Sequence, residues 1–173
     1  MAVYTYKTGQ AKRKDFKVAW AGAKEGGLLL LGKGVEDMPI SMNATTNEND
    51  DVLGNHAYEV ASYAETMTID PVYVDGNDEY STWLNDIVYY RKTLDEVRTS
   101  YVGYEDYVTD ETGNMRAWKQ DAVVNITDFA TGLTGVNIPH EVHFVDERTF
   151  GHIDKSTGEF VEDDMGALRR VKK

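Results

Sequence analysis

Residues 98–129 contain the pattern that most constrains the fold of this chain. Two segments, 98–109 and 115–129, alternate polar and apolar residues and are separated by Asp-Glu-Thr-Gly-Asn at 110–114. A period of two is typical of β-strands, and Asp, Asn and Gly tolerate the tight backbone of a turn. One face of the second segment is formed by Trp118, Ala122, Val124 and Ile126. The sequence therefore predicts a long antiparallel hairpin with one apolar face.

Further strands are expected on both sides of this hairpin. Short apolar or alternating segments, bounded by turn residues, occur at 16–20, 28–31, 35–42, 57–74, 138–147, 149–154 and 159–162. Pro39 confines its segment to a sheet edge or a bulge, and Pro71 indicates a break in the segment that contains it. No internal repeat or low-complexity linker interrupts the chain.

One amphipathic α-helix is predicted at about 78–92. Its apolar stripe follows the helical repeat and consists of Tyr80, Trp83, Leu84, Ile87 and Val88. Asp78 is suited to cap the first turn, and Arg91 and Lys92 complement the helix dipole at the other end. Strands, one helix and more strands favour a mainly β fold, an antiparallel β-sandwich or barrel with one flanking α-helix, over residues 15–162.

Composition indicates an ordinary globular protein. The chain has 173 residues, of which 41% are hydrophobic, which suits one domain. It contains no cysteine, so disulfides and thiol chemistry are excluded. No apolar run approaches the roughly 18 to 20 residues of a membrane span, and the N-terminus lacks the pattern of a secretory signal. We therefore expect synthesis in the cytoplasm and no membrane partner.

The charge is distributed unevenly along the chain. The total is −12, but residues 1–20 carry +4 and residues 169–173 carry +4, so that residues 21–168 carry −20. The basic ends of one copy could therefore dock on the acidic body of another, or they could simply be solvated. The acidic body disfavours nucleic-acid binding. We expect an N-terminal arm at 1–14 and a basic C-terminal tail at 163–173.

The sequence contains no convincing catalytic, cofactor or metal pattern. His-Glu-Val-His at 140–143 places its histidines three residues apart on a predicted strand, so their rings point to opposite faces. The glycines at 32–34 and 132–135 fit turns better than phosphate- or nucleic-acid-binding loops. The acidic run at 48–51 lacks the spacing of a calcium loop. We therefore expect no enzyme activity and no cofactor.

A long polar loop is predicted at 43–56. The stretch Ser-Met-Asn-Ala-Thr-Thr-Asn-Glu-Asn-Asp-Asp at 41–51, which overlaps the start of this loop, lies between two segments that read as strands and is too long for a tight hairpin turn. Its polarity suits a segment that stays soluble until a partner orders it. We expect this loop to be disordered in an isolated subunit.

Three phrases, together with the order of the elements, resemble a known family. The phrases are YSTWLNDIVYYRKTLDEVRTSYVGYEDYV, AWKQDAVVNITDFATG and NIPHEVHFVDERTFG. They are similar to the major tail protein, or tail tube protein, of long-tailed bacteriophages that infect Gram-positive bacteria, and the resemblance covers roughly residues 15–153. It implies a tail-tube-like β-sandwich with a flanking helix. The basic end at 169–173 has no match in the family.

The resemblance also implies a function and partners. Such subunits assemble as hexameric rings that stack into the tail tube of the virion, through which DNA passes during ejection without specific binding. The partners would be further copies of the chain and other tail proteins, such as tape measure and tail-end proteins. An acidic channel wall would let DNA slide, because it repels phosphate.

Contact residues follow from the same resemblance. The long loop of such proteins reaches toward the adjacent ring, and here that role falls on Asn43, Thr45, Thr46, Asn47, Glu48, Asn49, Asp50 and Asp51. The N-terminal arm is a second expected contact, through Lys12, Arg13 and Lys14.

Two other functions stay open from the sequence. A soluble β-sandwich binding module would use Trp20, Trp83, Trp118 and the eleven tyrosines to hold a carbohydrate or a host surface, although such aromatics are more often core residues. A tail completion or connector protein with the same fold would form one ring that does not stack.

Overall fold

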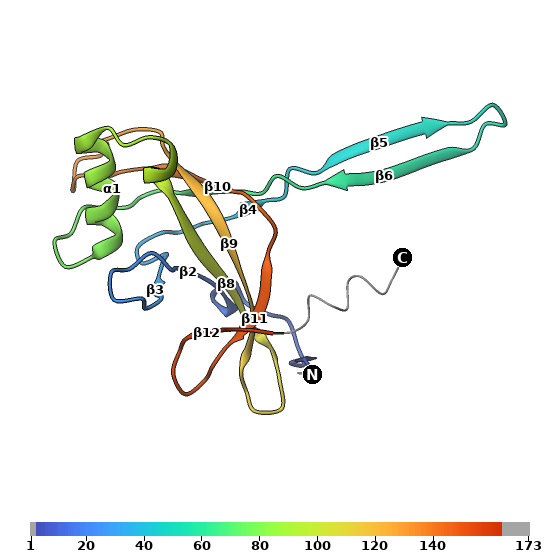
Figure 1. The fold of residues 1–173 in the computed structure, drawn as a ribbon, viewed down its shortest axis with the longest axis horizontal. Helices are drawn as coiled ribbons and strands as arrows, with labels where there is room; N and C mark the ends of the chain where they lie inside the picture. The colour runs from blue at the N-terminus through green and yellow to red at the C-terminus, as the bar shows by residue number, and fades with distance from the viewer. Residues whose placement is uncertain (1–2, 164–173) are drawn as a thin grey trace.

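The fold is built on the predicted long hairpin. The structure is a computed structural model that describes residues 3–163. β8 (Arg98–Thr109) and β9 (Met115–Ile126) pair in antiparallel register, with Gly103 opposite Trp118. These are the two longest strands, and Figure 1 shows them crossing the centre of the body.

Both edges of this hairpin are extended into a ten-stranded sheet in which every pairing is antiparallel. The main path runs β3-β2-β8-β9-β10-β7-β4; β1 pairs with β8, β11 with β9, and β12 with β11. The remaining strands are β1 (Thr5–Tyr6), β2 (Phe16–Trp20), β3 (Leu29–Leu30), β4 (Ile40–Ser41), β7 (Thr66–Ile69), β10 (His140–Phe144), β11 (Thr149–Ile153) and β12 (Phe160–Glu162). The mainly β, antiparallel fold class is thereby confirmed.

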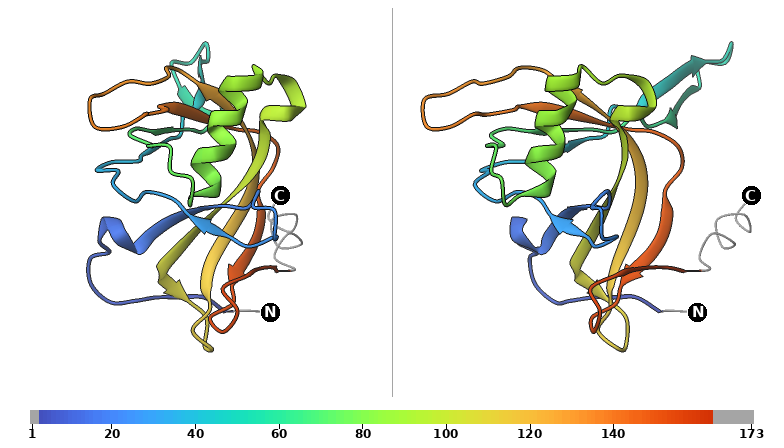
Figure 2. Two further views of the ribbon diagram at one scale, coloured as in Figure 1. Left: turned by 90° about the vertical axis from the view of Figure 1, so that its left-hand side faces the viewer. Right: turned by 60° about the vertical axis from the view of Figure 1, so that its left-hand side comes forward.

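β9 supports two different neighbours along one edge. Its first half, residues 115–119, pairs with β11, and its second half, residues 122–126, pairs with β10. Asp121 accepts a backbone hydrogen bond from Val145 between these two partners. Figure 2 shows the resulting sheet as strongly curved, with the helix packed over one end of it.

The single α-helix, α1 (Glu79–Tyr90), is confirmed close to its predicted bounds. Asp78 caps it, because its carboxylate accepts the backbone N–H groups of Tyr80 and Ser81, each at 3.3 Å. Arg91 ends the helix in the left-handed region with φ of 50°. Two short 3-10 helices, η1 (Arg13–Asp15) and η2 (Leu94–Val97), precede β2 and β8.

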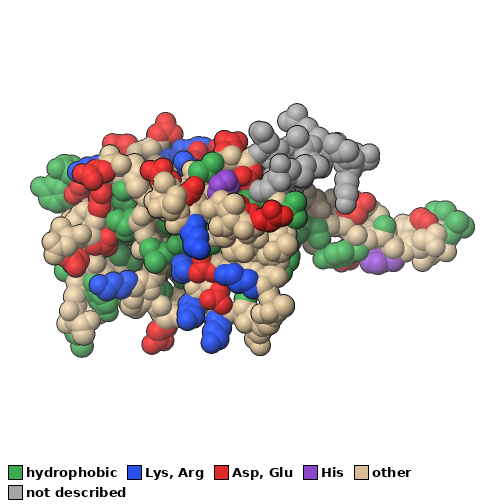
Figure 3. Space-filling model, turned by 90° about the horizontal axis from the view of Figure 1, so that it is seen from below, with side chains coloured by type: hydrophobic (Ala, Val, Ile, Leu, Met, Phe, Trp, Pro, Cys, Tyr) green, Lys and Arg blue, Asp and Glu red, His purple; other side chains and the backbone are tan. Residues whose placement is uncertain are grey.

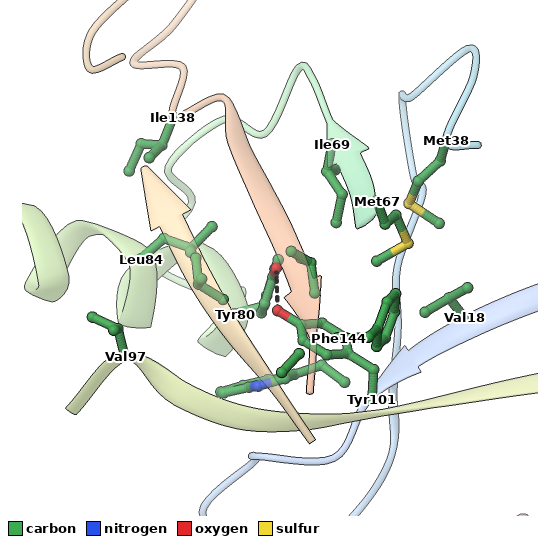
Figure 4. Packing of buried hydrophobic residues seen from close by; sticks show 14 of the residues in the cluster. Val18, Met38, Met67, Ile69, Tyr80, Leu84, Val97, Tyr101, Ile138 and Phe144 are labelled. Carbon is green, nitrogen blue, oxygen red and sulfur yellow. Dashed lines mark hydrogen bonds between the residues drawn. The ribbon is translucent and has the colours of Figure 1, made fainter. Parts of the chain in front are cut away.

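The core lies between α1 and one face of the sheet. Its fully buried side chains come from the helix and from β2, β7, β8 and β10, and include Val18, Met67, Leu84, Tyr101 and Val142. Figure 4 shows Tyr80 and Tyr101 pointing toward each other, and their hydroxyl oxygens are 2.9 Å apart. A smaller apolar cluster on the opposite side of the β8–β9 hairpin contains Val102, Ala117 and Ile153.

Two predicted segments differ from the structure. Only β4 (Ile40–Ser41) is a strand within 35–42, consistent with Pro39 lacking the N–H that a ladder requires. The predicted loop at 43–56 is wrong: it contains β5 (Thr45–Asp50), which pairs with β6 (His56–Ser62) in a separate two-stranded sheet. The expected disorder of this segment is therefore also corrected.

Candidate assembly surface

The β5–β6 hairpin extends from the body as an arm (Figure 1). Among the described strands β5 pairs only with β6, and all six residues of β5 and all seven of β6 are exposed. A two-stranded hairpin without a packed face is only marginally stable alone in water. This arm therefore gains little from burial within its own chain.

The two faces of the arm differ in chemistry. Residues directly opposite each other in an antiparallel pair share a face. One face pairs acidic side chains with aromatic rings, because Glu48 lies opposite Tyr58 and Asp50 lies opposite His56. The other face is formed by Asn47, Asn49, Ala57 and Glu59. On the first face the His56 Nδ1 and Asp50 Oδ1 atoms are 2.6 Å apart.

A well-formed turn at 51–55 closes the arm. The Asp51 Oδ1 atom accepts the backbone N–H groups of Leu53, at 2.8 Å, and Asn55, at 2.9 Å. The side-chain amide of Asn55 donates to Asp51 Oδ2 and is the main cause that lowers the pKa of Asp51. The turn presents two apolar side chains to solvent: Val52 is fully exposed and Leu53 is 83% exposed.

The base of the arm is fixed to the body by Asn43. Its backbone has φ of 46°, and its side-chain amide donates to the Ala64 carbonyl at 3.0 Å and to Thr66 Oγ1 at 3.1 Å. Asn43 thus joins the start of the arm to the body. Of the predicted contact residues, Thr45, Thr46, Asn47, Glu48, Asn49 and Asp50 form β5, and Asp51 forms the turn.

Four apolar contact candidates were missed by the sequence reasoning. Val52, Leu53, Tyr58 and Val60 are all exposed on the arm. The signal that could have found them is the turn itself, because Asp51-Val52-Leu53-Gly54-Asn55 repeats the Asp, Gly and Asn positions of residues 110–114. That match would have placed a hairpin where a loop was expected.

An apolar groove of about 480 Å³ lies on the body beside the base of the arm. Segments distant in the sequence line it: Ala11, Lys12, Arg13, Phe16, Met38, Pro39, Ile40, Met42, Glu105, Tyr107, Trp118 and Arg148. The guanidinium carbon of Arg148 lies 4.1 Å from the centroid of the Trp118 ring. This stacking holds both side chains at the groove.

The described part of the N-terminal arm lies on its own body. Thr5 and Tyr6 pair with β8, and the Lys7 N–H donates to the Tyr107 carbonyl at 2.9 Å. Lys12 and Arg13 reach the rim of the groove, whereas Lys14 is exposed and does not line it. The predicted basic tail at 163–173 lies outside the described residues except for Asp163, which accepts a hydrogen bond from the Tyr4 hydroxyl.

Figure 3 shows the body and the arm together from below. Lysine and arginine side chains gather on the face of the body turned to the viewer, and hydrophobic side chains occupy the tip of the arm. The body and the arm therefore present surfaces of different character.

The two neighbouring histidines point to opposite faces, as predicted. His140 is fully buried; its Nδ1 atom donates to the Ile138 carbonyl at 3.0 Å, and its Nε2 atom accepts from the Tyr80 hydroxyl at 2.6 Å. Burial lowers the pKa of His140 to about 4. His143 is half-buried and lies 3.2 Å from Glu141. Within residues 3–163, no cluster of three His, Asp or Glu could hold a metal ion.

The tryptophans proposed for a binding module belong to the packed interior. Trp20 is 2% exposed and Trp118 is 9% exposed. Trp83 packs on Trp20 with ring centroids 5.2 Å apart. Trp20 is therefore not free to stack on a sugar from solvent. Across the described part of the chain, no helix has the length and apolar character needed to cross a bilayer.

The comparisons with known proteins include a similarity to a solved structure. No protein-family model matches the chain, and no curated protein matches its sequence. Among solved structures, the chain is similar to the anti-feeding prophage cap, described as the tube terminating cap, with 15% identity and a TM-score of 0.48. The match covers 86% of this chain and 95% of that one. Similarity at this level does not define the family or the function of this chain.

Proposed function

We propose that this chain is a structural protein of a phage-type tail that assembles with further copies of itself into stacked rings. By the family resemblance of residues 15–153, the rings are hexameric, form the tail tube of a virion and conduct DNA without binding it specifically. The protein is made in the host cytoplasm, contacts other tail proteins at the tube ends, and performs no catalysis.

The observation that carries this proposal is the β5–β6 arm. It is ordered by its own turn, yet all residues of both strands are exposed and its tip presents Val52 and Leu53 to water. Exposed apolar groups on a projecting element are typical of an interaction site. An arm that packs against no other strand among residues 3–163 is suited to contact another molecule.

The edges of the sheet support lateral joining in the same assembly. The main path ends at β3 and β4, which have two paired residues each. An edge strand offers unpaired backbone groups to a strand from another copy. In a closed ring every such edge is covered by the next subunit.

The test is to change the tip of the arm and follow assembly. The double variant Val52→Ser, Leu53→Ser keeps the turn residues Asp51, Gly54 and Asn55, so the arm should still form. We expect the circular dichroism spectrum of the wild type, and tubes that are absent or much shorter in negative-stain images. The matched control, Glu111→Ser with Thr112→Ser, changes the same two positions of the second turn and should leave tube length unchanged.

Other outcomes separate the alternatives. Full-length tubes from the Val52→Ser, Leu53→Ser variant would remove the arm from the proposed function. Wild-type protein that forms single rings at every concentration would instead indicate a completion or connector protein. A wild-type monomer that binds glycans on an array would indicate the binding module.

A further inference from the structure

We propose that the groove beside the base of the arm receives the tip of the arm of a second copy. This inference rests on the proposed function, in which the arm contacts a neighbouring copy, and it identifies the receiving surface. The groove is the one lined by residues 11–16 and 38–42 together with Glu105, Tyr107, Trp118 and Arg148.

The first argument is the match of apolar groups. Val52 and Leu53 stand adjacent at the tip, held in place by the turn on which they lie. The apolar part of the groove lining is formed by Phe16, Met38, Pro39, Ile40, Met42 and Trp118. A volume of about 480 Å³ lies within the range of sites that hold small ligands, so it suits two aliphatic side chains. Their burial there would remove the most exposed apolar surface of the arm from water.

The second argument is charge complementarity. The Arg13 guanidinium donates to the Phe16 and Met38 carbonyls, each at 3.0 Å, so it is fixed at the groove. Among the described residues no carboxylate forms an ion pair with Arg13, whereas Glu105 of the groove is already paired with Arg116 at 2.6 Å. Lys12 adds a second positive charge at the rim.

The arm supplies the opposite charge. Four acidic side chains lie near its tip: Glu48, Asp50, Asp51 and Glu59. Neither β5 nor β6 contains a lysine or an arginine. An acidic arm with an apolar tip therefore complements an apolar groove with a basic rim. This complementarity selects the groove over the exposed apolar residues near η2, where Asp95 and Glu96 repel the arm.

The third argument is geometric. The arm leads away from the body, and six residues of β5 at about 3.3 Å each place its tip roughly 20 Å from its base. The groove lies at that base, so the tip cannot reach the groove of its own chain. The contact is therefore between unlike surfaces of two copies, and each copy has one tip and one groove. Such contacts continue from copy to copy, as a ring or a stack requires.

The test uses the absence of cysteine from the chain. Leu53→Cys and Met42→Cys are made as separate single variants; Met42 lines the groove and is 43% exposed. The two proteins are mixed, allowed to assemble and oxidised, and disulfide-linked dimers are counted by non-reducing electrophoresis. The matched control pairs Leu53→Cys with Leu94→Cys, since Leu94 in η2 is 84% exposed and lies outside the groove.

We expect dimers from the Leu53→Cys and Met42→Cys mixture, and at most trace amounts from the control mixture or from either protein alone. Lys12→Glu in the Met42→Cys protein should slow dimer formation by about fivefold. Glu48→Lys in the Leu53→Cys protein, mixed with the Lys12→Glu protein, should restore most of the original rate of dimer formation. The two charges are then opposite again, with their signs exchanged.

The outcomes distinguish this inference from the proposed function. Tubes that form normally while the control mixture cross-links as well as the Met42→Cys mixture would overturn the groove and leave the arm as a contact. Lys12→Glu without effect on the rate would overturn the charge argument and with it the choice of this groove. A wild-type protein that stays monomeric under all assembly conditions would overturn both proposals.

Discussion

The two hairpins of this protein end in the same turn but relate to the rest of the chain in opposite ways. In both turns the first Asp N–H donates to the carbonyl of the last Asn at 3.0 Å, and the Asp Oδ1 atom accepts the Asn N–H at 2.9 Å. The glycines Gly54 and Gly113 have φ of 81° and 88°. The turns at 51–55 and 110–114 are therefore equivalent in backbone chemistry.

The strands that flank these turns are what differ. β8 and β9 bury alternating side chains, among them Tyr101, Trp118 and Ala122, whereas β5 and β6 bury none. Turn chemistry thus determines where the chain reverses, and the alternation of apolar residues determines whether the hairpin joins a core. The same turn therefore closes the central hairpin of the sheet at 110–114 and the projecting arm at 51–55.

The largest difference in unfolding free energy between the two hairpins should come from replacing one tyrosine in each. Tyr101→Ala in β8 should lower the free energy of unfolding by about 3–5 kcal/mol, because a fully buried ring and its hydrogen bond to Tyr80 are lost. Tyr58→Ala in β6 should change it by less than about 0.5 kcal/mol. Urea denaturation checks both, and equal losses would remove the distinction between the hairpins.

Acid should lower the stability of the body through His140. The pKa of His140 is about 4, well below the ordinary 6.5, because the buried ring is held neutral. The unfolded chain therefore takes up a proton first, so the contribution of His140 is complete above pH 6.5 and declines as the pH falls. Stability should drop by about 3 kcal/mol by pH 4 through this residue.

Two histidine variants isolate that contribution in denaturation curves measured between pH 7 and 4. His140→Gln should flatten the pH dependence in this window, even if its stability at pH 7 is lower. His56→Gln is the matched control, because it removes a histidine from the exposed arm and leaves the buried ring of His140 in place. A wild-type stability that is constant across the window would contradict the role given to His140.

A larger side chain placed in each hairpin should give a smaller difference in unfolding free energy. A Cβ atom at Gly103 would lie 2.5 Å from the Trp118 ring, which covers this glycine from the opposite strand. Gly103→Ala should therefore cost about 1–3 kcal/mol in unfolding free energy, since Trp118 must move. Ala57→Val in exposed β6 should cost almost nothing. Thermal denaturation compares the two, and an unchanged Tm for Gly103→Ala would show that the ring relaxes freely.

The smallest global effect should come from the shared turn itself. Gly113→Ala and Gly54→Ala each force a side chain into the left-handed region, at a local cost of about 1–2 kcal/mol. The first should appear in the unfolding free energy, because β8 and β9 are part of the cooperative core. The second should leave that value unchanged and speed amide hydrogen exchange in 45–62 alone. Equal exchange changes in both hairpins would contradict this division.

The sequence predicts the elements that contribute to the core. The strands at 16–20 and 98–109 and the helix near 79–90 were found because their apolar residues recur with the period of the structure they form. β5 could not be found in this way, since Thr-Thr-Asn-Glu-Asn-Asp contains no apolar residue. Its strand exists because β6 pairs with it and because Asp51 closes the turn.

The candidate site was predicted only in part. The sequence predicts contacts through Asn43, residues 45–51 and, in the arm at 1–14, Lys12, Arg13 and Lys14; the structure adds the exposed apolar tip at Val52 and Leu53. The groove could not be inferred, because η1, the segment at 38–42 and residues Trp118 and Arg148 are brought together only by the curved sheet. Local pattern contains no information on such a juxtaposition.

Trp118 belongs to two surfaces at once, and this limits how the protein can change. Its ring packs against Phe144 in the core, with centroids 5.5 Å apart, and it also lines the groove. A substitution that reshapes the groove at this position therefore also disturbs folding, whereas Val52 and Leu53 can vary without that cost. Among descendants of one ancestral chain, we expect the arm tip to diversify faster than the floor of the groove, so that new partner preferences arise first on the arm.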